Sequence, residues 1–80
     1  MDEQARPEDV VWENTLDQGT WGCKVVRTGD YTGVLTAWRV SDREEILNET
    51  VGLSYRAIFG PDVDDVRDWQ ERVIKAVDAR

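Results

Sequence analysis

The chain has 80 residues, which is enough for one small domain with a modest core. Its formal net charge is -7, and acids outnumber bases in both halves of the chain. Because nucleic acids and anionic membranes are bound largely through Lys and Arg, this balance argues against direct binding to either.

The cysteine and histidine content bears on location and metal chemistry. Cys23 is the only cysteine and histidine is absent, so neither an internal disulfide nor a zinc site is expected. The first residues lack the apolar segment of a signal peptide, and no apolar run approaches membrane-spanning length. The sequence therefore predicts a cytoplasmic protein with no cofactor, no metal and no membrane partner.

The chain begins with a polar stretch, residues 1–9, which contains Pro7 and is predicted to be a flexible leader. Residues 10–80 are predicted to form the single domain. From Val10 onward apolar residues recur with a period of two, which is typical of half-buried strands.

The clearest local signal is the pair Gly29 and Asp30, which suits a two-residue hairpin loop because Gly supplies the positive φ. With that loop, Trp21 lies opposite Trp38. Even-length loops at residues 17–20 and 41–44 extend the same pattern into a meander. The large apolar residues of one face then form the predicted core face: Val10, Trp12, Leu16, Trp21, Cys23, Val25, Val34, Trp38, Val40, Leu47, Val51 and Leu53. Tyr55, Ala57 and Phe59 continue this set, as an extension of the last strand.

The period changes at Pro61, which suits the first turn of a helix. Apolar residues then recur at helical spacing over residues 62–78, in a stripe made of Val63, Val66, Trp69, Val73, Ile74 and Val77. The predicted fold is α+β: a three- to four-stranded antiparallel β-meander followed by one C-terminal amphipathic helix. This helix is expected to cover the sheet face that carries Trp21 and Trp38.

The opposite face of the sheet is unusually apolar for a surface that faces solvent. Its predicted partner-binding residues are Lys24, Val26, Tyr31, Leu35, Arg39 and Ile46. Cover by residues 1–9, or ordinary scattered surface hydrophobes, would explain the same pattern. The first functional hypothesis is a non-enzymatic protein-interaction module that binds another protein or itself.

Two other functions stay open. An acidic inhibitor that imitates nucleic acid would need rows of carboxylates, for which Asp64, Asp68, Glu71 and Asp78 are candidates, but arginines interrupt these rows. A hydrolase that uses carboxylates is the third hypothesis, weakened by the absence of histidine as a general base. The acidic run that begins at Asp62 lacks the glycine and glutamate of a calcium loop, so helix capping explains it better.

Overall fold

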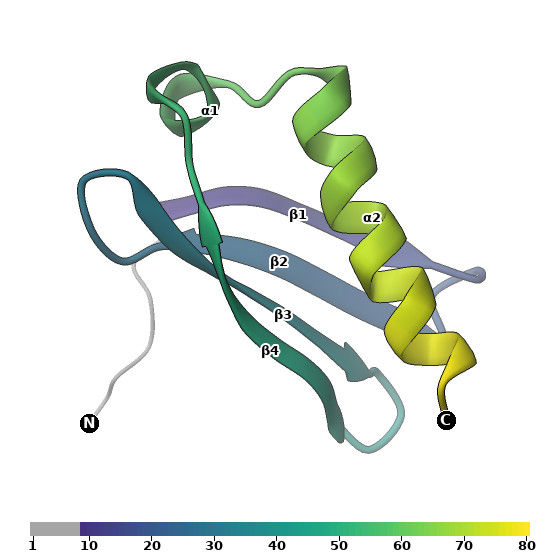
Figure 1. Cartoon of the computed structure of the whole chain (residues 1–80). Helices are drawn as coiled ribbons and strands as arrows, with labels where there is room; N and C mark the ends of the chain where they lie inside the picture. Colours follow the sequence, from purple (N-terminus) through teal and green to yellow (C-terminus); the bar gives the residue numbers. More distant parts are fainter. Residues whose placement is uncertain (1–8) are drawn as a thin grey trace.

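The computed structural model describes residues 9–80 and contains one four-stranded antiparallel sheet followed by two helices (Figure 1). The strands pair in chain order, so the sheet is a meander. The elements are β1 (Val10–Leu16), β2 (Trp21–Arg27), β3 (Thr32–Arg39), β4 (Glu45–Gly52), α1 (Tyr55–Phe59) and α2 (Val63–Asp78). The predicted α+β class, an antiparallel meander with a C-terminal helix, is confirmed. Most of the predicted leader, residues 1–8, lies outside the described residues.

The turn between β1 and β2 has the predicted even length. Leu16 pairs with Trp21 and Trp12 with Val25, so residues 17–20 form the loop. Asp17 and Gln18 adopt positive φ angles of 53° and 55°, which tighten the chain enough to reverse its direction. Trp12 and Leu16 therefore lie on the same face as Val25, as the sequence predicts. Val10, also predicted on that face, pairs with Val26 on the opposite face because the register shifts between Val10 and Trp12.

The turn between β2 and β3 is longer than predicted, and this changes the register. Arg27 pairs with Gly33, and the Thr28 and Gly29 amides both donate to the Thr32 carbonyl at 3.0 and 3.3 Å. Trp21 therefore pairs with Arg39 rather than with Trp38. A one-residue change of register moves every side chain of a strand to the other face. The predicted faces of β3 were wrong for this reason.

The core face of β3 consequently carries its smaller apolar side chains. Leu35 pairs with Val25 and Ala37 with Cys23, and all four residues are fully buried. Val34 and Trp38 lie on the opposite face, and Val40, also predicted in the core, is 46% exposed. The buried cluster is completed by residues of β4 and of the segments that follow it: Val51, Leu53, Ala57, Trp69 and Val73.

A β-bulge in β4 shifts its pairing with β3 by one residue, so that the apolar residues of β4 face the core. Ala37 pairs with Leu47 whereas Trp38 pairs with Glu45, so Ile46 is the extra residue of the bulged strand. Leu47 and the buried Val51 therefore lie on the core face, as predicted, but their partners on β3 are Ala37 and Gly33 rather than Trp38 and Val34.

The segment predicted to extend the last strand forms the short helix α1. The Ser54 hydroxyl caps it by accepting from the Ala57 amide at 3.0 Å. Because alternate residues of a helix point to different sides, only Ala57 enters the core, while Tyr55 and Phe59 are exposed.

Helix α2 begins one residue after its predicted start. The Asp62 carboxylate accepts from the Asp64 and Asp65 amides, and the Asp65 carboxylate accepts from the Asp62 amide, which completes a capping box. Trp69 and Val73 are buried, and the Trp69 ring centroid lies 5.6 Å from that of Trp12 on β1. Two members of the predicted apolar stripe are exposed instead, Val63 at 71% and Ile74 at 48%.

Candidate protein-interaction site

The most extended candidate site is the sheet face opposite the buried cluster, which we call the open face. Its centre consists of Val26 and Val34, which pair across β2 and β3, and of Lys24, Thr36 and Trp38 beside them. All five side chains are partly exposed. Since the buried residues of α1 and α2 belong to the opposite cluster, the apolar part of the open face is not covered by either helix.

Trp38 is the largest side chain of the open face, and two neighbours fix its position. It pairs with Gly22, where an added Cβ atom would lie 2.6 Å from the indole ring, so the ring lies directly over the glycine backbone. The Lys24 ammonium is 5.9 Å from the ring centroid, within range of a cation–π interaction. Val40, Arg43 and Glu45 border the hollow beside the ring.

The charges around this apolar centre balance. Glu13 lies opposite Lys24 in the β1/β2 ladder, and Arg43 and Glu45 lie beside Trp38. These two acids and two bases make the region locally neutral, whereas the whole chain has a net charge of -7. Another acidic protein could approach this face without local repulsion.

Two of the six predicted partner-binding residues, Lys24 and Val26, lie together on the open face. Leu35 does not. Its side chain is fully buried in the core, so the prediction that it is exposed on this face was wrong, as the longer β2–β3 turn explains.

The remaining three predicted residues are dispersed. Arg39 is held by the β3–β4 turn, where its guanidinium binds Asp42 at 2.8 Å and Glu44 at 2.6 Å. Ile46 occupies the bulge of β4 and packs against the buried cluster. Tyr31 lies in the β2–β3 turn, 57% exposed. The structure therefore does not gather the six predicted residues into one site.

Sequence reasoning missed an aromatic cluster at one end of the molecule. Tyr55 and Phe59 of α1 are 68% and 77% exposed, and their ring centroids are 5.2 Å apart in an edge-to-face arrangement. These two rings line a shallow groove, and Tyr31 of the β2–β3 turn lines it too. The missed signal was Ser54 three residues before Ala57, an N-cap position that marks a helix start within an apparently alternating pattern.

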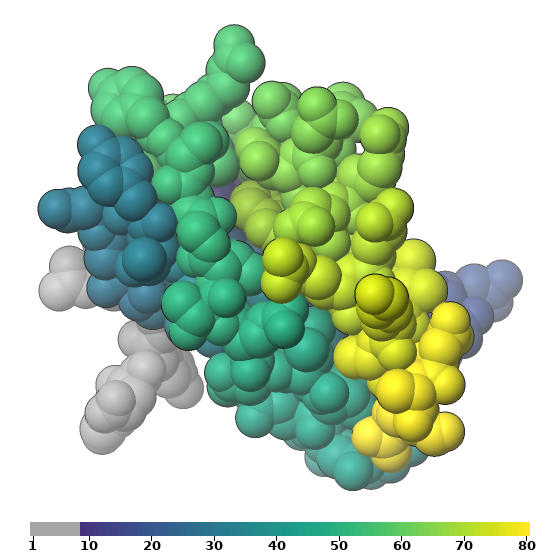
Figure 2. Space-filling model, viewed as in Figure 1, coloured from purple at the N-terminus to yellow at the C-terminus, as the bar shows by residue number. Residues whose placement is uncertain are grey.

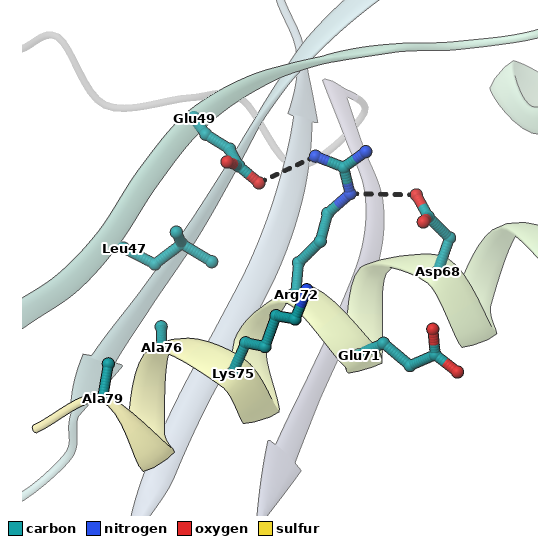
Figure 3. Close-up of a pocket in the computed structure, with 8 residues that line it drawn as sticks. All are labelled: Leu47, Glu49, Asp68, Glu71, Arg72, Lys75, Ala76 and Ala79. Carbon is teal, nitrogen blue, oxygen red and sulfur yellow. Dashed lines mark hydrogen bonds and ion pairs between the residues drawn. The ribbon is translucent and has the colours of Figure 1, made fainter.

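A hollow lies between β4 and α2, and salt bridges occupy it (Figure 3). Arg72 points between two carboxylates: its Nη1 donates to Glu49 at 2.9 Å and its Nε to Asp68 at 3.0 Å. These hydrogen bonds, above all the one to Glu49, raise the pKa of Arg72. Since the guanidinium neutralises both acids, the arrangement offers no free carboxylate pair for acid–base chemistry.

Cys23 is placed for packing rather than for reaction. Its side chain is fully buried, and its Sγ donates to the Asn14 carbonyl across the β1/β2 ladder at 3.6 Å. Burial raises the pKa of the thiol to about 11, which keeps it protonated at neutral pH.

Comparison of the chain with protein-family models, with curated proteins and with solved structures gave no match. Within residues 9–80, no three Cys, Asp or Glu side chains are grouped so that they could hold a metal ion. Neither described helix has the length and apolar character needed to cross a bilayer.

Proposed function

We propose that this domain is a non-enzymatic protein-interaction module whose open face associates with the open face of a second copy. The observation that carries the proposal is the Trp38 ring, which lies over Gly22 beside Val26 and Val34 on a partly exposed sheet surface. Tryptophan is among the residues that contribute most to protein–protein binding. Two such faces can stack as sheets do in a sandwich, about 10 Å apart.

Charge favours a second copy as the occupant at this face. Two chains of net charge -7 repel one another over most of their surfaces. The open face is the region where Lys24 and Arg43 offset Glu13 and Glu45. A two-fold arrangement can place the Lys24 of each copy near a carboxylate of the other.

The size of the open face predicts a weak dimer. Four strands spaced about 4.8 Å apart, each about seven residues long at about 3.3 Å per residue, cover about 19 Å by about 23 Å. Two such faces bury about 900 Å² in total, which is below the range of about 1,200–2,000 Å² for stable complexes. The proposed association is therefore transient and depends on protein concentration.

The two other functions receive less support. The carboxylates of α2 are interrupted by basic partners, with Arg72 on Asp68 and Arg67 3.7 Å from Asp64, whereas a nucleic-acid mimic needs a nearly uniform negative surface. A hydrolase of this kind needs a general acid whose pKa is raised, whereas Arg39 lowers the pKa of the Asp42 carboxyl to about 2. The free, buried thiol of Cys23 supports a reducing compartment, so the proposal places the domain in the cytoplasm. The net charge of -7 supports the part of the proposal that excludes nucleic-acid and membrane partners.

Sedimentation equilibrium over a wide range of protein concentration tests the proposal. The mass is expected to rise from monomer toward dimer, and more so at high salt, which screens the repulsion between acidic chains. Val34→Lys is expected to abolish this rise even though it reduces the net negative charge.

Val63→Lys, at the exposed start of α2, makes the same substitution and the same change in charge away from the open face and is the matched control. Circular dichroism confirms that both variants fold. A wild-type protein that stays monomeric at every concentration contradicts the proposal, as does a folded Val34→Lys variant that still dimerises.

A further inference from the structure

A second surface, separate from the open face, lies where the β2–β3 turn meets α1, and we call it the aromatic groove. It is lined by Arg27, Asp30, Tyr31, Tyr55, Ile58 and Phe59. In Figure 2 the blue atoms of the turn and the green atoms of α1 adjoin at one end of the molecule. The groove is shallow, with a volume of about 170 Å³.

The backbone holds the two sides of the groove together. The Leu53 amide donates to the Tyr31 carbonyl at 2.9 Å, which ties the turn to the segment that leads into α1. Leu53 and Ala57 are buried in the core, so the segment that leads into α1 and the helix itself are both anchored. Tyr55 and Phe59 are four residues apart on a helix and therefore project on the same side.

Folding does not account for the aromatic side chains at this position. Phe59 is 77% exposed and Tyr55 is 68% exposed, so neither ring contributes much buried area to the core. Aromatic rings that stay in water on an ordered framework are typical of interaction sites, where they lose little conformational entropy on binding.

We infer that the aromatic groove binds a proline-rich segment in the polyproline II conformation, with a basic residue beside the prolines. Such segments are recognised by exposed aromatic side chains that form the walls of shallow grooves. Their backbone makes no internal hydrogen bonds, so its carbonyls can accept from the hydroxyls of Tyr31 and Tyr55. Because the volume of about 170 Å³ is smaller than that of ordinary ligand pockets, about 300–1,000 Å³, the groove suits successive side chains of an extended chain.

A single carboxylate, Asp30, selects the basic residue at the edge of the groove, whose other charged lining residue is Arg27. The Asp30 side chain is 94% exposed, and its nearest base, Arg27, is 3.8 Å away while the Arg27 Nε donates to the Gly29 carbonyl. Asp30 is therefore available to an incoming Arg or Lys at the edge of the groove. The net charge of -7 attracts the same kind of ligand at longer range.

An arginine-flanked polyproline peptide, titrated into the isotopically labelled protein, tests this inference by NMR. Saturable shifts are expected at Tyr31, Tyr55 and Phe59, with none at Trp38. Two peptides of equal length are the controls: one with glutamate in place of arginine, and one with the same arginines on a Gly-Ser chain. Both are expected to bind at least about tenfold more weakly, which corresponds to about 1.4 kcal/mol.

Phe59→Ala and Tyr55→Ala are each expected to weaken binding about tenfold or more, because aromatic residues at the centre of an interface dominate its affinity. Val63→Ala is the matched control, since Val63 is 71% exposed, apolar and outside the groove. Asp30→Asn should reduce the preference for the arginine-flanked peptide over the glutamate-flanked one, leaving the part that comes from the net charge of the chain.

Three results would overturn the inference: no saturable shift, equal binding of the Gly-Ser peptide, or full affinity of both folded aromatic variants. The monomeric Val34→Lys variant should bind the peptide normally, so failure of the dimer proposal and failure of this inference can be told apart.

Discussion

The indole of Trp38 lies over the backbone of Gly22, its cross-strand partner, so closely that a Cβ atom at residue 22 would be 2.6 Å from ring atoms Cε2 and Cζ2. A glycine in the middle of a strand normally weakens the sheet, because it has no side chain to pack. Here the tryptophan covers that gap. Because residue 22 has no side chain, the indole ring can lie flat against the sheet, and this determines the shape of the open face.

Gly22→Ala is expected to move Trp38 without unfolding the domain. The new methyl group meets a side chain that is partly exposed and can rotate toward solvent. We expect a change in the free energy of unfolding of less than about 1.5 kcal/mol, together with a large shift of the Trp38 indole N–H resonance and weaker self-association. An indole resonance that does not move would contradict this placement of the ring.

Leu35 and Val34 are neighbours in sequence that point to opposite faces, and their truncation should separate folding from association. Leu35→Ala creates a cavity in the core and should cost about 2–5 kcal/mol, a large part of the stability of a small domain. Val34→Ala is expected to cost about 1 kcal/mol or less, because the side chain is already partly exposed, and to weaken self-association. Urea denaturation measures both values. Similar losses of stability would mean that β3 has a different register.

Elements set by local signals could be predicted from the sequence. The apolar stripe and the Asp62 cap define α2, and the alternating pattern defines four strands, because both depend on residues close in the chain. The register between β2 and β3 could not be predicted in the same way. Both Val34/Trp38 and Leu35/Ala37 form an apolar row on β3, so the hydrophobic pattern does not distinguish the two registers.

The length of one turn decided which row is buried, and it affected the candidate site as well. Lys24 and Val26 were placed correctly because β2 keeps its predicted faces, whereas Leu35 was misplaced with the rest of β3. The aromatic groove was missed because Tyr55 and Phe59 were interpreted as strand residues. Their exposure depends on the one-turn helix that Ser54 caps, a feature too short to produce a helical period.

Asp42 is expected to titrate well below a normal aspartate. Hydrogen bonds from Arg39 and from the Glu44 amide lower its pKa from 3.8 to about 2. A lowered pKa in the folded state stabilises the fold above the unfolded-state pKa, and this contribution is lost as pH falls from about 4 to about 2. An NMR titration of the Asp42 carboxyl carbon measures the value. Arg39→Gln should raise the midpoint toward 3.8, and an unchanged midpoint would mean that Arg39 is not the cause.

Cys23 is expected to report unfolding rather than to react in the native state. Its thiol is fully buried between β1 and the core, and burial raises its pKa from 9.0 to about 11. The thiolate is the nucleophile that attacks thiol reagents, so at neutral pH modification should require unfolding of the domain. In Leu35→Ala, modification should accelerate by the same factor by which the unfolding equilibrium constant increases. A pKa raised in the folded state also means that this contribution to stability is complete below pH 9 and is lost as pH rises toward about 11. Cys23→Ser should remove most of that high-pH dependence. Fast modification of the native wild-type protein at pH 7, at the rate of a free thiol, would show instead that β1 opens locally and exposes the edge of the sheet.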